Sequence, residues 1–527
     1  MSVLESCLGQ FSGNGPIQIW SMAPLFTGVG WGELLMSFYC CIYYNVIVAY
    51  ALLFAWKSLP TYQNGVINTV LPYSKNSTFC QGWRDSRNFQ IENTNSTVSA
   101  KISHTCQEAY YNQEILQDSG DMTSGLSSLN YQLCFSLLVA WILIFLTQIK
   151  SAKSTGKTAY ITSTLPYVCL TILLIRVTML EGASIGLEQY FSVNIDSLFT
   201  AKIWADASQQ VFWSQGIAWG VLIIYASHNP FELNVYRYAW RQSLINACTS
   251  VYAGVVIFSS LGFLAFDNNG GNVELATKNF NKVIGQSQKL AFVIYPTALS
   301  QMGGASWVMA ILFFVMLATL GIGSQIGIFM AVYEGVMEKF DEWSFKKRQI
   351  NNKIENQNIN SETSTSAQSN KLYLTLLCLL NIICAYPLVS KSGASWLSWF
   401  DSYCSHLSLQ LFALIEIVSV SWIYGIDNFI QDIEFMMGRP LPIKRVWVVL
   451  WKYVTPCYTM VTLMLALVNS YNKKMMMIDG IPDWANYAGW LLPISEILFV
   501  PVLMVYYKFD RMTMPKFYGR RNEYSKK

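Results

Sequence analysis

Charged residues and histidine are scarce in this chain of 527 residues. Asp, Glu, Lys and Arg together make up 13% of the sequence, and there are three histidines. An average soluble domain carries about 25% charged residues, so this chain has too few charges to cover a water-facing surface. The scarcity excludes a soluble enzyme, a disordered scaffold and a small secreted disulfide protein.

Motifs for metal and nucleotide chemistry are also missing. The sequence contains neither HExxH nor CxxC. Gly156-Lys157-Thr158 resembles the end of a phosphate-binding loop, but Ser151 stands where that loop requires its first glycine. The net charge of +4 is small and its Lys and Arg form no basic face, which argues against nucleic acid. We therefore expect no enzymatic activity and no organic cofactor.

Apolar residues are abundant and occur in long runs. They make up 53% of the chain, and a helix needs about 20 of them in sequence to cross the roughly 30 Å hydrocarbon core of a bilayer. This composition predicts an all-α, multi-pass membrane protein in the lipid bilayer. The predicted spans are 33–56, 132–149, 159–180, 204–227, 244–266, 305–333, 372–391, 404–426, 446–469 and 486–507.

Lys and Arg in the connecting segments predict the orientation. Five basic segments are separated by two spans each time, so they lie on one side of the membrane, which the positive-inside rule makes the cytoplasm. Both termini are then cytoplasmic, and the chain is expected in the plasma membrane. The basic segments contain Lys150, Lys153 and Lys157; Arg237 and Arg241; Lys346, Lys347, Arg348 and Lys353; Arg439, Lys444 and Arg445; and Lys508 to Lys527.

The long loop 57–131 is then extracellular. It carries two glycosylation sequons, at Asn76 and Asn95, as an external loop can. Cys80 and Cys106 are the only cysteines of this loop, which favours a disulfide between them over two free thiols.

The remaining segments complete the domain organisation. We predict a cytoplasmic segment over 1–26, a transmembrane domain over 27–508 and a cytoplasmic tail over 509–527. Within the transmembrane domain, 345–371 is polar and poor in apolar residues, which predicts a disordered cytoplasmic loop.

Polar residues inside the predicted spans are the candidates for function, because polar groups are costly in hydrocarbon and usually face a cavity or an ion path. The run 206–220, DASQQVFWSQGIAWG, is the most polar. A helix break at Gly216 and Gly220 would free carbonyls for an ion, whereas a GxxxG packing face explains the same glycines equally well. Asn246 in the next span offers an amide oxygen.

Two further spans carry isolated polar groups. The segment Leu320-Gly-Ile-Gly-Ser324 also has two explanations, an ion site or close helix packing. Glu416 lies within an apolar span, where an unpaired carboxylate is expensive, so we expect it to be protonated or hydrogen-bonded in a structural role rather than in a proton relay. Tyr44 lies in mid-span and needs a polar partner there.

At these residues the chain resembles the sodium- and chloride-dependent neurotransmitter and amino acid transporters, the neurotransmitter:sodium symporters. The similarity covers nearly the whole chain, and the matching pieces arrive in the family's order. They include LGQFSGNGPIQIW, SFYCCIYYNVIVAYALLF, WADASQQVFWSQG, SLINACTS, FFVMLATLGIGS and IEIVSVSWIYGIDNFIQDI.

The resemblance implies an inverted-repeat sodium symporter fold in which about ten of the twelve family helices are present. The first helix and most of the second have no counterpart in this sequence, so the resemblance implies the end of a truncated helix and a cytoplasmic loop over 1–26 and a transmembrane transporter domain over 27–508. In the family, the first helix supplies half of each sodium site and contacts the substrate.

The resemblance also implies ion ligands, with Na⁺ and Cl⁻ as the bound or co-transported ions. The first sodium site would be formed by Ser214 and Asn246, and the second by Ser324 and the carbonyl of Leu320. The side chains around chloride would be those of Gln210, Ser214, Asn246 and Ser250.

The gates and the substrate pocket follow in the same way. Tyr44 matches the tyrosine that closes over the substrate, and Trp213 stands where the family usually has a gating phenylalanine. Asp401 stands at the acidic member of the outer gate. Cys40 and the backbone around Gly216 would line the pocket for a small-molecule substrate.

Several positions depart from the family pattern. Gly323 stands where the second sodium site usually has a side-chain oxygen, and Ile217-Ala218 replaces a glycine-rich break. The extracellular loop keeps Cys80, and Cys106 would serve as its partner. Two functions are therefore predicted: symport of a small amino acid or amine coupled to sodium and chloride, or a non-transporting membrane scaffold or sensor of transporter descent.

Overall fold

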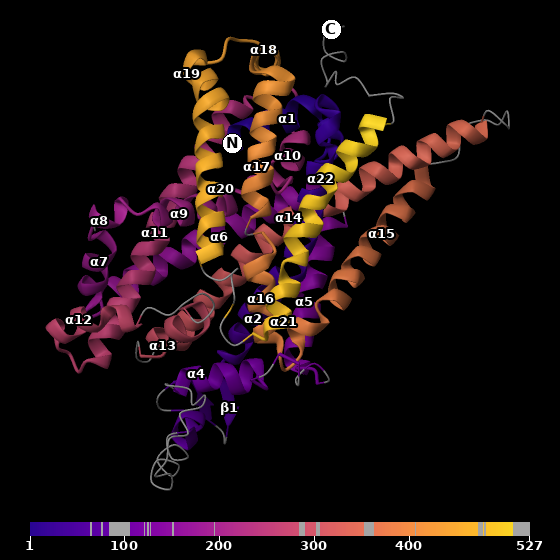
Figure 1. Ribbon diagram of the computed structural model, residues 1–527. Helices are drawn as coiled ribbons and strands as arrows, with labels where there is room; N and C mark the ends of the chain where they lie inside the picture. Colours follow the sequence, from indigo (N-terminus) through magenta and orange to yellow (C-terminus); the bar gives the residue numbers. More distant parts are fainter. Residues whose placement is uncertain are drawn as a thin grey trace.

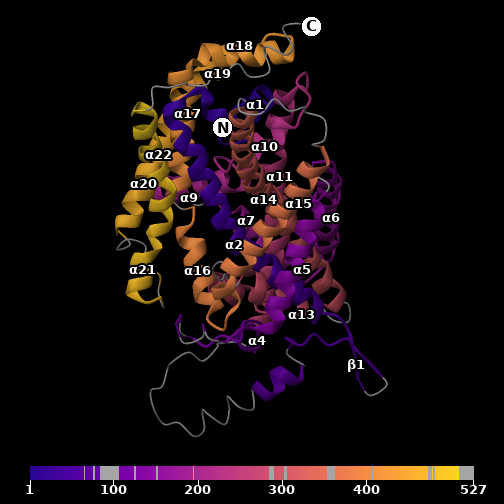
Figure 2. The ribbon, with the colours of Figure 1, turned by 90° about the vertical axis from the view of Figure 1, so that its right-hand side faces the viewer.

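Helices in a bundle make up most of the described chain (Figure 1). The computed structural model describes residues 1–63, 66–74, 77–83, 106–120, 122–123, 126, 128–149, 152–193, 195–283, 290–301, 306–352, 363–405, 407–472, 478 and 481–509. At one end of the bundle lie α4 and β1, and at the other lie α1, α18 and α19; a view from the side shows the same two ends (Figure 2).

The helix boundaries follow the apolar runs and the breaks between them. The α-helices are α1 (Ser2–Ser12), α2 (Thr27–Lys57), α4 (Cys106–Tyr110), α5 (Tyr131–Gln148), α6 (Ala152–Thr178), α7 (Ala183–Phe191), α8 (Ile195–Leu198), α9 (Ala201–Gln215), α10 (Val221–Ser227), α11 (Val235–Asn268), α12 (Val273–Val283), α13 (Tyr295–Ser300), α14 (Ser306–Asn352), α15 (Thr363–Cys384), α16 (Gly393–Tyr403), α17 (Ser408–Val418), α18 (Ile426–Met437), α19 (Lys444–Val449), α20 (Thr455–Asn472), α21 (Asp483–Gly489) and α22 (Leu491–Phe509). The 3₁₀ turns are η1 (Gln18–Met22), η2 (Pro24–Phe26) and η6 (Tyr386–Val389), and the π-helical stretches are η3 (Tyr111–Leu116), η4 (Leu290–Ile294), η7 (Ser419–Gly425) and η8 (Leu450–Val454).

Eight helical segments in the described residues are long and apolar enough to cross a membrane, and each contains most or all of one of the predicted spans. The other two predicted spans are divided differently. The run 204–227 is split between α9 and α10, and the run 372–391 is divided between the end of α15 and η6. Apolar length thus predicts where the chain crosses, but not where a helix breaks.

Helix α2 lies at the centre of the bundle. It packs against α14, α22, α5 and α17. In the most apolar window of α2, 67% of the residues are buried inside the protein, whereas in the segment Asp483–Tyr506, which contains α22, the corresponding share is 22%. Helix α22 therefore lies at the lipid-facing edge of the bundle. A central helix therefore needs apolar side chains around its whole circumference, and α2 has them.

The first helix is buried along its whole length. Every residue of α1 is buried, and α1 packs against α10 and α11. Gly9 permits this approach, because a Cβ atom there would lie 2.3 Å from the carbonyl oxygen of Ile223. Residues 1–26, predicted as a helix end and a loop, thus form α1 followed by η1 and η2.

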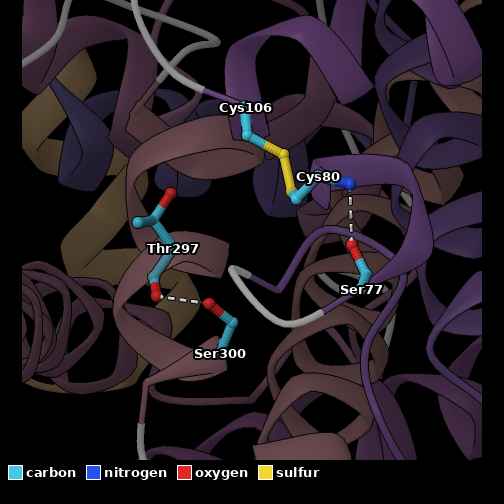
Figure 3. Close-up of a disulfide and its surroundings, with 5 residues drawn as sticks. All are labelled: Ser77, Cys80, Cys106, Thr297 and Ser300. Atoms are coloured by element: carbon cyan, nitrogen blue, oxygen red, sulfur yellow. Dashed lines mark hydrogen bonds between the residues drawn. A yellow bond between two sulfur atoms is a disulfide. The ribbon is translucent and has the colours of Figure 1, made fainter. Parts of the chain in front are cut away.

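The large loop after α2 contains a short hairpin and a disulfide. Strands β1 (Thr61–Gln63) and β2 (Val66–Asn68) pair antiparallel, with Tyr62 opposite Ile67. The predicted disulfide between Cys80 and Cys106 is confirmed, with a Cα–Cα distance of 5.4 Å. Thr297 and Ser300 of α13 lie in its surroundings (Figure 3). The sequons at Asn76 and Asn95 lie outside the described residues.

An aromatic cluster holds the described part of this loop onto α2. Phe54, in the last turn of α2, packs against Tyr73 and Tyr111, with ring centroids 6.0 and 6.2 Å apart. Tyr73 in turn packs against Tyr110, next to Cys106 on α4. Burial raises the pKa of both the Tyr73 and Tyr110 phenols, so both stay neutral at physiological pH.

We expect the double substitution of Cys80 and Cys106 by serine to destabilise this loop by about 3 kcal/mol. The cross-link joins residues separated by 26 positions, and removing it restores that closure entropy to the unfolded chain. Protease cleavage of the loop in the purified protein, followed over a temperature series, measures the loss. The matched control is serine at Cys248 and Cys457, which are free and exposed. Equal cleavage in both double variants would contradict the prediction.

The polar loop predicted over 345–371 is shorter in the structure. Helix α14 continues to Asn352 and α15 begins at Thr363, so helix enters the segment from both sides. Lys, Arg and Gln are good helix formers, which explains why a sequence without an apolar face can extend a helix beyond the membrane. Residues 353–362 and the tail after Phe509 lie outside the described residues.

Candidate substrate and ion site

A break in the polar span is the centre of the candidate site. Helix α9 ends at Gln215 and α10 begins at Val221, and between them Gly216, Ala218 and Gly220 have φ values of 69°, 58° and 70°. Positive φ is strained for alanine, so packing and hydrogen bonds must hold this segment open. Of the two explanations that the sequence allows for the glycines, the backbone adopts the break, even with Ile217-Ala218 at its middle.

Groups from α1 and α2 hold the break. The backbone N–H of Ala218 donates to Oε1 of Glu5 at 3.0 Å, and the hydroxyl of Ser37 donates to the carbonyl of Trp219 at 3.0 Å. Gly220 packs directly on Pro16, where a Cβ atom would come within 2.8 Å. Both backbone bonds are buried, so they replace helix hydrogen bonds that the break removes.

The residues of the proposed first sodium site come together beside the break. The amide nitrogen of Asn246 on α11 donates to the hydroxyl oxygen of Ser214 on α9 at 3.1 Å. The Ser250 hydroxyl donates to the backbone carbonyl of Asn246 at 3.0 Å. Gln210 lies one turn before Ser214 on α9, and its side chain is exposed, as are those of Ser214 and Ser250. The four proposed chloride residues thus lie on two neighbouring helices.

The proposed second sodium site lies within one turn of α14. The hydroxyl of Ser324 donates to the carbonyl of Leu320 at 3.3 Å. Gly323, between them, faces α6, where a Cβ atom would lie 3.3 Å from the hydroxyl oxygen of Thr162. Thr162, Gly323 and Tyr225 line a cavity of about 320 Å³. The sequence carried no signal for Thr162, because it is placed beside Gly323 only by helix packing.

The proposed gating residues form an aromatic group across the break. The rings of Tyr44 and Trp213 have centroids 5.7 Å apart, and Trp213 meets Trp219 edge-on at 5.6 Å. The Tyr44 hydroxyl also interacts with Ser324, which is the polar partner that a mid-span tyrosine needs. The group therefore connects α2, the end of α9 and α14.

The other pocket residues lie around this aromatic group. Cys40 is buried one turn before Tyr44 on α2. Asp401 is an exposed residue of α16, a helix that packs against α2, which carries Cys40. Gly216 is open, with no atom within 4 Å of the place a Cβ atom would take.

Three buried carboxyl groups lie behind the break. Glu5 on α1, Glu33 on α2 and Glu416 on α17 are each at most 1% exposed, and they lie within electrostatic range of one another. In the described residues, neither carboxyl oxygen of Glu416 has a hydrogen-bond partner. Glu416 was predicted to need a structural partner; Glu5 and Glu33 are the residues that the sequence reasoning missed. The signal that could have identified Glu5 and Glu33 is the presence of a glutamate in an otherwise apolar run. Three ionised carboxylates would repel one another strongly in such a place.

The fold and the site together define a class of protein. A multi-pass α-helical protein whose span is broken in the middle, with polar side chains of neighbouring helices gathered at the break, has the architecture of a secondary transporter. Residues 1–511 match the model of the sodium:neurotransmitter symporter family. The chain belongs to this family.

Characterised relatives are similar along nearly the whole chain. The human sodium- and chloride-dependent neutral and basic amino acid transporter B(0+) is 32% identical over 95% of this chain and 76% of its own length. Glycine transporter 1 of Xenopus laevis is 31% identical over 95% of this chain and 75% of its own length. The betaine transporter of Caenorhabditis elegans is 29% identical over 96% and 78%. All three are named as sodium- and chloride-dependent.

Proposed function

We propose that the chain is a symporter that couples inward movement of sodium, together with chloride, to uptake of a small amino acid or amine across the plasma membrane. The observation that carries this proposal is the pairing of Asn246 with Ser214 beside the break at 216–220. Sodium moving down its gradient supplies the driving force, provided that ion and substrate bind the same conformation of the protein.

The proposed ligands suit the two ions. Hydroxyl, amide and backbone oxygens are the hard donors that replace the water shell of a small cation, and Ser214, Asn246, Ser324 and the Leu320 carbonyl provide them. Hydroxyl and amide N–H groups can donate to chloride, which suits Gln210 and Ser250. At the second site, the Thr162 hydroxyl stands beside Gly323, where the family pattern lost an oxygen.

The aromatic group provides closure over a substrate. Movement of Trp213 relative to Tyr44 and Trp219 would open or cover the space beside the unwound backbone, whose free carbonyls and N–H groups suit the charged ends of an amino acid. The relatives' names, which cover neutral and basic amino acids, glycine and betaine, agree with a substrate of this size.

Uptake into cells that express the full chain tests the proposal. Labelled glycine, leucine, lysine and betaine are offered in medium containing sodium chloride, in medium with sodium replaced by N-methylglucamine, and in medium with chloride replaced by gluconate. We expect uptake of at least one substrate to require sodium and to fall without chloride. Uptake indifferent to both ions would contradict coupled symport.

A non-transporting scaffold or sensor is the second candidate. Gly323 favours it, because this residue removes a side-chain oxygen from the second sodium site, and the Ser214 and Ser324 side chains are both exposed in the described chain. This candidate predicts a folded chain at the cell surface without ion-dependent flux. Sodium-driven uptake by the 527-residue chain rejects it.

We propose that the 57–131 loop is extracellular and both termini are cytoplasmic. Helices α18 and α19 lie at the opposite end of the bundle from α4 and β1 (Figure 2). Arg439 lies between these two helices, and Lys444 and Arg445 begin α19, which agrees with this orientation. In a eukaryotic host, we expect glycosidase treatment to increase electrophoretic mobility, and Asn76→Gln and Asn95→Gln each to remove part of that shift. A chain insensitive to glycosidase would argue against the external placement.

A further inference from the structure

A large apolar cavity lies away from the candidate site. It has a volume of about 830 Å³ and is lined by residues from α2, α5 and α14 and from the start of the loop after α2. Most of its lining is aliphatic or aromatic, including Leu52, Leu53, Phe135, Val139 and Ile311. It lies where α2 ends and where α5 and α14 begin.

This cavity faces the lipid rather than the protein interior. All three helices are long and apolar enough to span a membrane. Among the residues that line the cavity, Trp56, Tyr131 and Phe135 are 71%, 80% and 69% exposed. Large aromatic residues exposed at the end of membrane helices are typical of the interface between hydrocarbon and headgroups. The cavity therefore opens toward lipid.

The dimensions of the cavity correspond to one leaflet. Its lining on α5 extends from Tyr131 to Val139, which is about 12 Å along the helix axis at 1.5 Å per residue. Half of a bilayer's hydrocarbon core is about 15 Å thick. A chain lying parallel to the helices would thus remain in contact with apolar walls from the headgroup level almost to the midplane.

The two long polar side chains of the lining lie at the headgroup level, and Ser136, one turn deeper, donates its hydroxyl to the backbone carbonyl of Gln132. Lys57 is the last residue of α2, and Gln132 lies in the first turn of α5, at the same end of the bundle. Lys57 is the only charged residue of the lining. An ammonium group on a flexible stem at this depth is complementary to a phosphate, and basic residues beside a membrane attract anionic headgroups by about 1 kcal/mol each.

We propose that this groove binds one phospholipid from the leaflet on the side of the 57–131 loop, with an acyl chain between α2, α5 and α14 and its phosphate held by the Lys57 ammonium. The site contains none of the residues proposed for sodium, chloride or substrate. It does not depend on the transport activity, and either can fail without the other.

Photolabelling of the full chain tests the site. The chain is reconstituted into vesicles of phosphatidylcholine that contain a trace of phosphatidylglycerol with a diazirine in mid-chain. After illumination, the cross-linked peptides are mapped by mass spectrometry. We expect labelling to concentrate on residues 52–59 and 131–139. Labelling spread evenly over the lipid-facing helices would overturn the proposal.

Two pairs of variants test the acyl and phosphate contacts separately. Val139→Trp fills the groove and should remove most of the labelling, whereas Leu146→Trp, at a lipid-facing position of the same helix outside the groove, should leave it unchanged. Lys57→Gln should lower labelling about fivefold and Lys57→Arg should preserve it. Equal labelling in the two tryptophan variants would overturn the proposal. It would also be overturned if a sterol competed fully with the probe and Lys57→Gln had no effect on labelling.

Discussion

Alanine at Asn246 is expected to abolish sodium-dependent uptake at physiological sodium concentrations. Asn246 is the side chain of α11 that donates a hydrogen bond to Ser214, so alanine removes a proposed sodium ligand and frees the Ser214 hydroxyl that Asn246 contacts. Loss of one contact to a charged group corresponds to roughly a 10- to 150-fold increase in the half-saturating sodium concentration. The measurement is uptake against external sodium, with surface expression determined in parallel.

The neighbouring residue Gln242 provides the matched control. It lies one turn before Asn246 on α11, its side chain is exposed, and it is not among the proposed ion ligands. Gln242→Ala should therefore leave the sodium curve unchanged, while Ser214→Ala should shift it in the same direction as Asn246→Ala. An unchanged sodium curve for Asn246→Ala would remove Asn246 from the ion site and weaken the proposed function.

Replacing Glu5 by leucine is expected to destabilise the folded chain by about 1–3 kcal/mol, the cost of leaving a buried hydrogen-bonding group without its partner. Glu5 Oε1 accepts the N–H of Ala218, which has positive φ in the middle of the break. Without that acceptor, a strained peptide group is left in an apolar environment. The thermal midpoint of the purified protein in detergent should fall by several degrees.

Glu5→Gln separates hydrogen bonding from charge at the same position. The glutamine amide oxygen can accept the Ala218 N–H, so this variant should stay close to the parent in stability. If both substitutions lowered the midpoint equally, the carboxyl group itself, through Glu33 and Glu416, would be the stabilising element instead of the bond to the break. If neither substitution had an effect, Glu5 would not support the break.

Parts of the site could be predicted because they are encoded locally. The spacing of Leu320 and Ser324 places both on one helix turn, and Cys80 and Cys106 had no other partner within their loop. The contact of Tyr44 with Trp213 was expected only through resemblance, since the two residues lie far apart in sequence. Thr162 beside Gly323, and Glu5 beside Ala218, had no local signal and depend on how distant helices pack.

Composition and hydropathy alone establish a multi-pass helical membrane protein, because burying some twenty apolar residues per helix in lipid depends on length and sequence content and not on neighbours. Composition and hydropathy do not decide whether the glycines of 216–220 serve close helix packing or a helix break. Only the folded chain settles that choice: the N–H of Ala218 and the carbonyl of Trp219 find buried partners on α1 and α2, far away in sequence. Such long-range hydrogen bonds offset the strain of the broken backbone, and no local pattern of residues encodes them.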